Sequence, residues 1–301
     1  MFDIVGKRPY FLAVSAVLIV ASAIALGVLG LHPGIDFGSG SLLTLKFEQP
    51  VAPAEVEGVL SDLGYVATAE KSEENILIRT SQLAAAEKTA LKRDLQEAFG
   101  ALEEEGFENV DPVIARETAR IAGIAVGISA VGILAYLTWA FRRMPRPLHY
   151  GTCALIALVH DIIIVLGVFS ILGGILDWET NLMFITGVLA VIGYSVNNTV
   201  VVFDRIRENL QRGISPHFEA VINSSLLDTL SRSLNTSLTT LVVLVALVLF
   251  VGASIQNFAV VLLIGVIAGT YSSLFVAPQL LAVWESGRWS GLLRRPVLPA
   301  R

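Results

Sequence analysis

The chain has 301 residues, of which 54% are hydrophobic and only 16% are charged. Soluble globular proteins carry about 25% charged residues, so this composition excludes an ordinary cytosolic enzyme and a disordered protein. The formal charge of −5 combines two unlike parts. Residues 32–117 hold 17 acidic and 7 basic residues, a balance of −10, whereas the rest of the chain has a balance of +5. The single cysteine, Cys153, excludes an internal disulfide and a zinc site built from cysteines.

Long uncharged runs predict six membrane-spanning helices, because a helix needs about 20 apolar residues to cross the hydrocarbon core. The run from 233 to 284 has 52 residues without Asp, Glu, Lys, Arg or His, so it must fold back, and 252–257 is its polar, turn-forming break. The first run is longer than the core of a signal peptide, so we expect it to remain as a span. The predicted spans are 10–31, 118–141, 149–173, 181–203, 231–252 and 257–284.

Basic residues predict the orientation of these spans, because lysine and arginine gather in cytoplasmic loops. With the N-terminus inside and six spans, every basic cluster falls on one side of the membrane. These clusters are Lys7 and Arg8; Arg142, Arg143 and Arg146; Arg205, Arg207 and Arg212; and Arg288, Arg294 and Arg295. Both termini are then cytoplasmic, with a tail over 285–301, and the acidic residues 32–117 lie outside.

Residues 32–117 have the pattern of a small α+β domain, in which alternating apolar residues predict strands and a 3.6-residue period predicts helices. In chain order, the expected elements are a strand over 41–48, a helix over 54–63, strands over 65–71 and 75–80, a helix over 84–104 and a strand over 106–115. This β-α-β-β-α-β order is that of a ferredoxin-like sandwich. We interpret the acidic run 103–105 as a solvated helix end and not as a metal site.

Ionisable side chains inside a span are costly, so each one is a functional candidate. Asp161 lies about 12 residues into the third span, roughly 18 Å deep and near the midplane. His160 precedes it and points elsewhere on the helix. Two interpretations remain open for this pair, namely a structural hydrogen bond to a neighbouring helix and a relay for protons or ions.

Two adjacent amides, Asn197 and Asn198, lie in the fourth span, where each must find partners without water. Arg232 begins the fifth span from the same side, so we expect Asn198 and Arg232 to lie at a similar depth and to be able to meet. The guanidinium stays charged at any working pH and needs an acceptor. The alternative is an interfacial arginine that extends its head into water.

Asp204, Arg205 and Arg207 follow where the fourth span leaves the membrane. Their opposite charges at close spacing predict a short interfacial helix with local ion pairs. The alternative is that these residues only fix the membrane topology and contact lipid headgroups. The sequence contains no Walker motif, GxGxxG, HExxH or serine-nucleophile motif. We therefore expect no enzyme activity, cofactor or metal, and any work must draw on a gradient or a partner.

Several sequence blocks together resemble the SecF family of bacterial protein-export membrane subunits. They are GIDFGSG at 34–40, with Gly34, Asp36, Phe37 and Gly40; VHDII at 159–163; GYSVNNTVVVFDRIREN at 193–209; LSRSLNTS at 230–237; and GTYSS at 269–273. The blocks follow the family's order. The resemblance implies an α-helical polytopic membrane protein with an RND-type half-bundle of six helices and an inserted extracytoplasmic domain, located in the bacterial cytoplasmic membrane.

The resemblance also implies a function in protein export. SecF pairs with SecD, and the pair associates with the SecYEG channel and helps to pull unfolded exported polypeptides outward with the proton-motive force. Carried over by position, Arg232 matches the family's arginine and Asp161 matches the aspartate of its third-span motif. The implied partners are SecD, SecYEG, the exported chain, the lipid bilayer and protons, and not nucleic acid. Two alternatives remain: a self-sufficient RND-like proton-coupled exporter of small molecules, and a scaffold subunit without coupling.

One departure from the family pattern affects the mechanism, because Asn198 stands where the family has an aspartate. An amide does not exchange a proton in the physiological range, although it can accept a hydrogen bond from Arg232. Three explanations remain: a natural variant that relays protons elsewhere, a variant that is not coupled to protons, and an engineered neutralisation. Gly38 and Ser39 also depart from the family's glycine-rich block, with less consequence because both are small.

Overall fold

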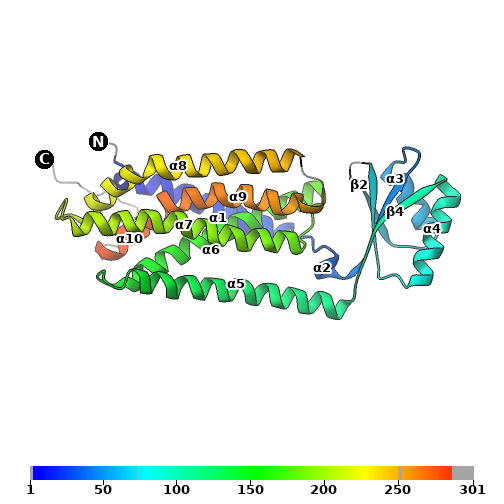
Figure 1. Cartoon of the computed structure of the whole chain (residues 1–301), viewed down its shortest axis with the longest axis horizontal. Coiled ribbons are helices and arrows are strands. Elements are labelled where there is room, and N and C mark those ends of the chain that lie inside the picture. The colour runs from blue at the N-terminus through cyan, green and yellow to red at the C-terminus, as the bar shows by residue number, and fades with distance from the viewer. Residues whose placement is uncertain (1–2, 73, 251–252, 287–301) are drawn as a thin grey trace.

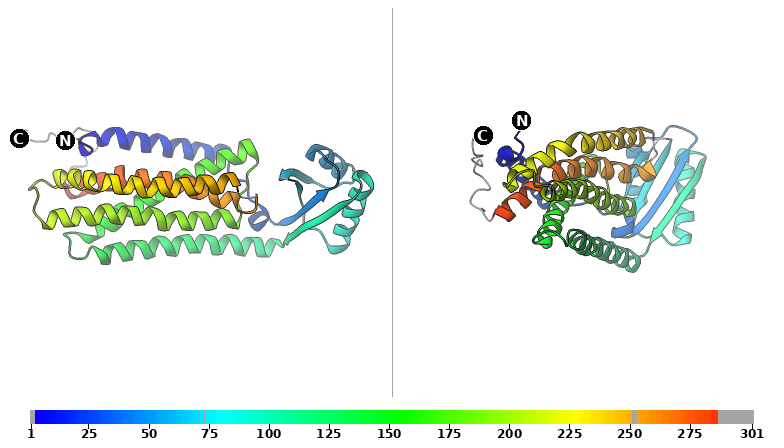
Figure 2. Two further views of the ribbon diagram at one scale, coloured as in Figure 1. Left: turned by 45° about the horizontal axis from the view of Figure 1, so that its top comes forward. Right: turned by 60° about the vertical axis from the view of Figure 1, so that its left-hand side comes forward.

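The computed structural model describes residues 3–72, 74–250 and 253–286. Six helical segments in this part of the chain are long and apolar enough to cross a membrane, which confirms the predicted number of spans. They lie side by side in a bundle, and a small domain with a sheet extends beyond one end (Figure 1). The start of the first span and the end of the last lie at the opposite end (Figure 2). The predicted basic tail, Arg288 to Arg295, lies outside the described residues.

The spans are single helices except for the last, which is broken once. They are α1 (Arg8–Val28), preceded by the 3-10 turn η1 (Val5–Lys7); α5 (Pro112–Ala140); α6 (Pro147–Leu176); α7 (Leu182–Gln211); α8 (Phe218–Phe250); and α9 (Ala253–Phe275) followed by α10 (Ala277–Ser286). The break falls at Val276, two residues before Pro278, whose ring and missing N–H interrupt a helix.

The helices extend further than the uncharged runs predict. Helix α5 begins at Pro112 and not near 118, and α8 begins at Phe218 and not near 231. The segment 204–209, expected as a separate interfacial helix, is the continuous last part of α7. Residues 253–257, expected in a turn, form the start of α9, and Gly252 lies outside the described residues. A helix does not end where hydrocarbon ends, so a hydropathy criterion misses its water-exposed part.

Helices α6, α7 and α9 form the centre of the bundle, while α1, α5 and α8 lie around them. Helices α7 and α9 share the most extensive contact, and glycine permits it. A Cβ atom added to Gly265 would lie 2.0 Å from a methyl group of Val191, and one added to Gly187 would lie 2.8 Å from Val261. Small residues therefore bring the two central backbones together, as in other membrane helix pairs.

The outer domain comprises four strands and two principal helices. They are β1 (Gly40–Phe47), α3 (Pro53–Asp62), β2 (Ala67–Ser72), β3 (Asn75–Thr80), α4 (Ala85–Phe99) and β4 (Leu102–Val110), after a short helix α2 (Ile35–Gly38). The sheet order is β2-β3-β1-β4 and all neighbours are antiparallel, which is compatible with a ferredoxin-like arrangement. Leu43, Leu45 and Ile78 of the sheet pack with leucines of α3 and α4 in an apolar core.

The acidic run 103–105 lies in β4, which corrects the expectation of a helix end. Helix α4 ends at Phe99 because Gly100 has φ +88°, a conformation that favours glycine. Glu104 accepts hydrogen bonds from Lys88 and, at 2.7 Å, from Lys92, and these bonds lower its pKa. Strand β4 ends at Val110, five residues before the predicted end, because Asp111 caps and Pro112 begins α5.

Candidate functional site

The centre of the bundle contains a fully buried carboxylate, Asp161 of α6. Its Oδ2 accepts hydrogen bonds from Ser195 Oγ of α7 at 2.6 Å and from Ser272 Oγ of α9 at 2.7 Å. Its Oδ1 lies 2.9 Å from Nδ1 of His160. The three central helices therefore meet at one carboxyl group.

These contacts suit a group that carries a proton. A carboxylate away from water is tolerated only when hydrogen bonds satisfy it, and Asp161 has two hydroxyl donors and an imidazole. A carboxyl group can accept a proton, and a serine hydroxyl can rotate to donate or to accept. Protonating Asp161 would therefore alter the bonds that tie α6 to α7 and α9.

His160 is buried beside Asp161 and packs against α9. Its ring stacks on Tyr271 with ring centroids 6.3 Å apart, and the Tyr271 hydroxyl donates to the backbone oxygen of Phe11 at 2.6 Å. His160 Nε2 has no hydrogen-bond partner among the described residues. The imidazole therefore has one nitrogen on the carboxylate and one available to a further ligand.

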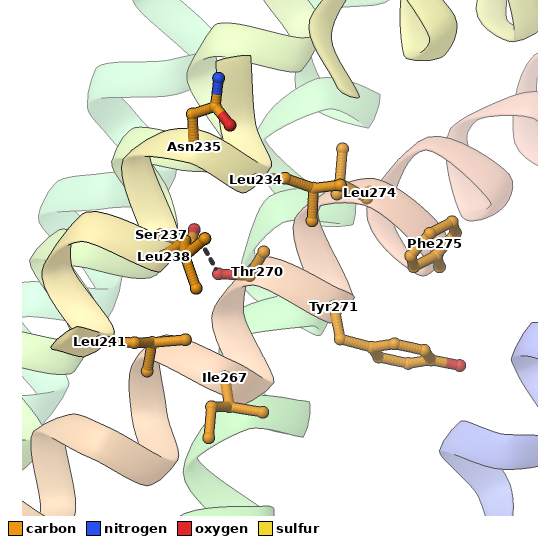
Figure 3. A pocket seen from close by; sticks show the side chains of 10 residues that line it. All are labelled: Leu234, Asn235, Ser237, Leu238, Leu241, Ile267, Thr270, Tyr271, Leu274 and Phe275. Carbon is orange, nitrogen blue, oxygen red and sulfur yellow. Dashed lines mark hydrogen bonds between the residues drawn. The ribbon is translucent and has the colours of Figure 1, made fainter. Parts of the chain in front are cut away.

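A second hydroxyl cluster lies beside the first, where α7, α8 and α9 meet. Ser237 Oγ accepts from Thr270 Oγ1 at 2.6 Å and from the Tyr194 hydroxyl at 3.2 Å. Figure 3 shows Ser237 and Thr270 pointing toward each other, while the Tyr271 ring points away from this pair. Ser237 and Thr270 line a groove of about 440 Å³ between α8 and α9. The rest of its lining is mainly apolar side chains such as Leu241.

The structure does not bring Asn198 and Arg232 together, contrary to the expectation. Asn198 is buried, and its Nδ2 has no hydrogen-bond partner in the described part of the chain. Arg232 is exposed on α8, while its neighbour Ser233 takes the buried position. Similar depth along two helices does not fix their rotation, and one residue turns a side chain by about 100°. Asn197 is likewise exposed, on α7.

Arg232 belongs to an exposed polar face of α8, which the sequence analysis did not identify. It consists of Arg232, Asn235, Thr236 and Thr239, all exposed at spacings i, i+3, i+4 and i+7. This spacing places the four residues on one side of a helix, so the sequence alone could have revealed the polar face. Polar groups in a span normally face protein or water, so this face is suited to a partner.

The expected local ion pairs at the end of α7 are present. Arg207 contacts Asp204 at 2.5 Å, and Arg205 contacts Glu208 at 2.7 Å. Arg205 also contacts Asp228 of α8 at 2.8 Å, a contact between helices that sequence spacing could not predict. The two arginines therefore have protein partners and fasten the ends of α7 and α8 to each other.

The glycine-rich block lies at the junction of the bundle and the outer domain. The Gly34 amide donates to the Thr180 backbone oxygen at 2.8 Å, and Asp36 accepts from the Leu182 amide at 2.9 Å. Phe37 is half-buried in α2, which packs against α5. The block thus attaches the outer domain to the loop between α6 and α7.

An ion pair lies at the same junction. Arg79 Nε of β3 lies 2.9 Å from Glu179 of the α6–α7 loop, and Arg79 also contacts Glu70 at 3.0 Å. Burial raises the pKa of Glu179, and the nearby arginine opposes this only in part. Gly40 has φ +128°, and a Cβ there would lie 2.6 Å from the Thr80 oxygen, so glycine is required where β1 begins.

Comparison with known proteins assigns a family. Residues 90–287 match the family described as "Protein export membrane protein SecD/SecF, C-terminal", and residues 24–51 match the "SecD/SecF GG Motif". "Protein translocase subunit SecF" from Anaerolinea thermophila is 39% identical over 306 residues, covering 100% of this chain and 99% of that protein. The SecF subunit of Thermobaculum terrenum is also 39% identical, with 98% of each chain covered.

Solved structures give the same result. The crystal structure of SecDF, a translocon-associated membrane protein from Thermus thermophilus, matches with a TM-score of 0.81 and 31% identity, covering 95% of this chain. The match spans 39% of that longer protein. The SecDF protein of Bacillus subtilis is 32% identical, with 38% of its length covered.

Proposed function

Because this chain belongs to the SecF family of protein translocase subunits, we propose that it promotes protein export with a SecD-type partner and that protons bound by Asp161 drive the process. One observation carries the proposal. Among the described residues, Asp161 is the only carboxylate that is buried, and it is bonded to two other helices. Buried ionisable groups in membrane helices commonly mark proton and ion pathways.

In this proposal Asp161 is the residue that binds the proton, which residue 198 cannot do. The amide of Asn198 does not bind a proton at physiological pH, whereas a carboxyl group does. Protonation at Asp161 would change its bonds to Ser195 and Ser272, and so change how α6 packs on α7 and α9. Each proton that crosses 100 mV supplies about 2.3 kcal/mol, so several protons provide enough free energy to move a polypeptide segment.

The polar face of α8 favours a membrane partner. Arg232 and three polar neighbours on this face are exposed in the chain alone, and such groups are costly against lipid. A SecD-type subunit that presents an acceptor to Arg232 would cover them. In this arrangement both termini are cytoplasmic in a bacterial inner membrane, and the outer domain lies outside, near the exported chain and SecYEG.

The groove between α8 and α9 weighs against a self-sufficient exporter of small molecules. Such an exporter needs a polar cavity within its own six helices, and this groove is lined mainly by apolar side chains. The exporter would also work without SecD. A scaffold subunit would bind SecD, but its export activity would not depend on a gradient.

The test is export in proteoliposomes that contain SecYEG, SecD and this chain, measured with and without an uncoupler. We expect Asp161→Asn to abolish the uncoupler-sensitive export, while Asp204→Asn, at the exposed end of α7, retains it. We also expect Asn198→Asp to raise proton flux, because it adds a second protonatable group near Ser195. Uncoupler-sensitive export that survives Asp161→Asn would overturn the proposal, and unchanged flux in Asn198→Asp would exclude position 198 as a relay.

A further inference from the structure

The turn between α5 and α6 presents three arginines at the end of the bundle opposite the outer domain (Figure 1). We refer to this turn, residues 141–146, as the arginine turn. Phe141 and Met144 are buried and fasten it to the apolar interior of the bundle. Its three arginines are all exposed: Arg142, Arg143 and Arg146.

Two prolines restrict the shape of the arginine turn. Arg146 lies between Pro145 and Pro147 and has φ +54°, which is uncommon for a residue other than glycine. Each proline ring fixes its own φ, so the chain on both sides of Arg146 has little freedom. A backbone that is already ordered loses little conformational entropy when it binds a ligand. The turn is therefore preorganised for binding.

The arginine turn lacks a counter-charge from its own chain. None of its three arginines forms an ion pair in the part of the chain that the structure describes, whereas Arg205, Arg207 and Arg212, near the same end, all pair with carboxylates of α7. Outside the described residues the chain has a single acidic side chain, Glu73, which follows β2 of the outer domain in the sequence. The counter-charge therefore comes from another molecule.

An exposed apolar surface borders the arginine turn. The guanidinium carbon of Arg142 lies 4.6 Å from the centre of the Trp139 ring. Trp139 and Tyr136, about one turn apart on α5, are both exposed, as is Leu148 at the start of α6. Exposed tryptophan and tyrosine near the end of a span are typical of the level of the lipid headgroups. The arginines therefore stand beside a surface that faces hydrocarbon chains.

A phosphate group matches the arginine turn in charge and in geometry. A guanidinium binds phosphate oxygens through paired N–H donors, and the turn has three guanidinium groups within five residues. Helix α6 begins directly after the turn, and no described side chain caps its first N–H groups, so its dipole also favours an anion there. An acidic protein segment would match the charge but not the lipid-facing Trp139 and Tyr136. A phospholipid matches both.

We propose that the arginine turn binds an anionic glycerophospholipid, with the phosphate on its three arginines and an acyl chain along Tyr136 and Trp139 of α5. The binding does not rest on the proposed function; only the leaflet, the cytoplasmic one, follows from the orientation given there. The bound lipid holds the end of α5 opposite the outer domain. Since the same helix leads into β4 at its other end, the lipid fixes one end of the connection between membrane and outer domain.

The test is the affinity of single phospholipids for the detergent-purified full chain, alone and in complex with a SecD-type partner, measured by native mass spectrometry. The probes are dioleoyl phosphatidylglycerol and, as the zwitterionic comparison, dioleoyl phosphatidylcholine. We expect Arg143→Gln to weaken phosphatidylglycerol binding about fivefold, which corresponds to about 1 kcal/mol for one arginine near an anionic surface. Replacing all three arginines by glutamine should make the affinities for the two lipids equal.

The matched control is Arg212→Gln. Arg212 is exposed near the same end of the bundle but already pairs with Glu208, so its loss is expected to change phosphatidylglycerol binding less than about twofold. If Arg143→Gln does not fold, Arg146→Gln supplies the same comparison.

Four results would overturn the proposal. The first is equal affinity of the unchanged chain for both lipids, and the second is an equal loss of binding in Arg143→Gln and Arg212→Gln. The third is loss of phosphatidylglycerol binding when the SecD-type partner is present, because an acidic protein surface would then cover the arginines. The fourth is competition by sn-glycerol 3-phosphate as strong as that by the whole lipid, which would assign the turn to a soluble phosphate ester.

Discussion

In the outer domain, the core between sheet and helices is built from apolar side chains, and charged residues pair at the surface, as where Lys88 and Lys92 bind Glu104. The bundle also has apolar clusters in its interior, but apolar side chains cover its outside as well, and Asp161 lies buried at its centre with its two serine partners. Burying a polar group costs free energy, and an apolar side chain in the same place would stabilise the fold equally well or better. An apolar core alone accounts for the stability of the outer domain, whereas the buried carboxylate of the bundle is the group that the proposed proton binding uses.

The largest expected effect tests the apolar core of the outer domain. Leu45→Ala removes a fully buried side chain of β1, and such changes cost about 2–5 kcal/mol. Leu63→Ala, at the exposed end of α3, is expected to cost less than about 0.5 kcal/mol. Hydrogen exchange of the β1 and β3 amides in the whole protein measures both. Similar costs for the two changes would mean that this core does not hold the domain together.

A smaller effect is expected at the polar centre of the bundle. Ser272→Ala removes one of the two hydroxyl donors to Asp161, and leaving a buried acceptor less satisfied costs about 1–3 kcal/mol. The matched control is Ser273→Ala, equally buried, whose hydroxyl bonds only its own helix at Thr270 and whose loss is expected to cost less than about 1 kcal/mol. Thermal unfolding in lipid nanodiscs separates the two, and a costlier Ser273→Ala would contradict the comparison.

The smallest effect is a pH dependence at the junction of the two regions. Burial raises the pKa of Glu179 above its ordinary value of 4.5, so its stabilising contribution is present below about 4.5 and is lost as pH rises through the higher, folded-state pKa. Glu179→Gln should therefore flatten the fall of Tm over that range. Glu74, whose pKa is lowered by its hydrogen bond from Lys46, has the opposite sign.

Measuring Tm against pH for both variants checks the signs. Glu74→Gln should remove a contribution that is lost as pH falls, whereas Glu179→Gln should remove one that is lost as pH rises. If the two variants change the profile of Tm against pH in the same direction, burial does not raise the pKa of Glu179 at the junction.

The features that could be predicted from the sequence are those that depend on local composition. Runs without charge located the spans, and Asp161 was found because ionisable residues inside spans are rare. Its donors Ser195 and Ser272 were not recognised as such, since hydroxyls are common in spans and their partners depend on how helices pack. The expected contact between Asn198 and Arg232 is absent for the same reason. Position in the sequence gives the depth of a residue in the membrane, but the rotation of each helix about its axis depends on packing.

Helix α5 has a mechanical consequence. It runs without a break from Pro112 to Ala140, and only Asp111 separates it from β4 of the outer domain. At 1.5 Å per residue the helix is about 44 Å long, so a tilt of about 5° at its inner end displaces its outer end by about 4 Å. Few of its residues are buried, and its packing is mainly against α6 and the short helix α2. Such a tilt would carry a small repacking around Asp161 outward as a displacement of the sheet.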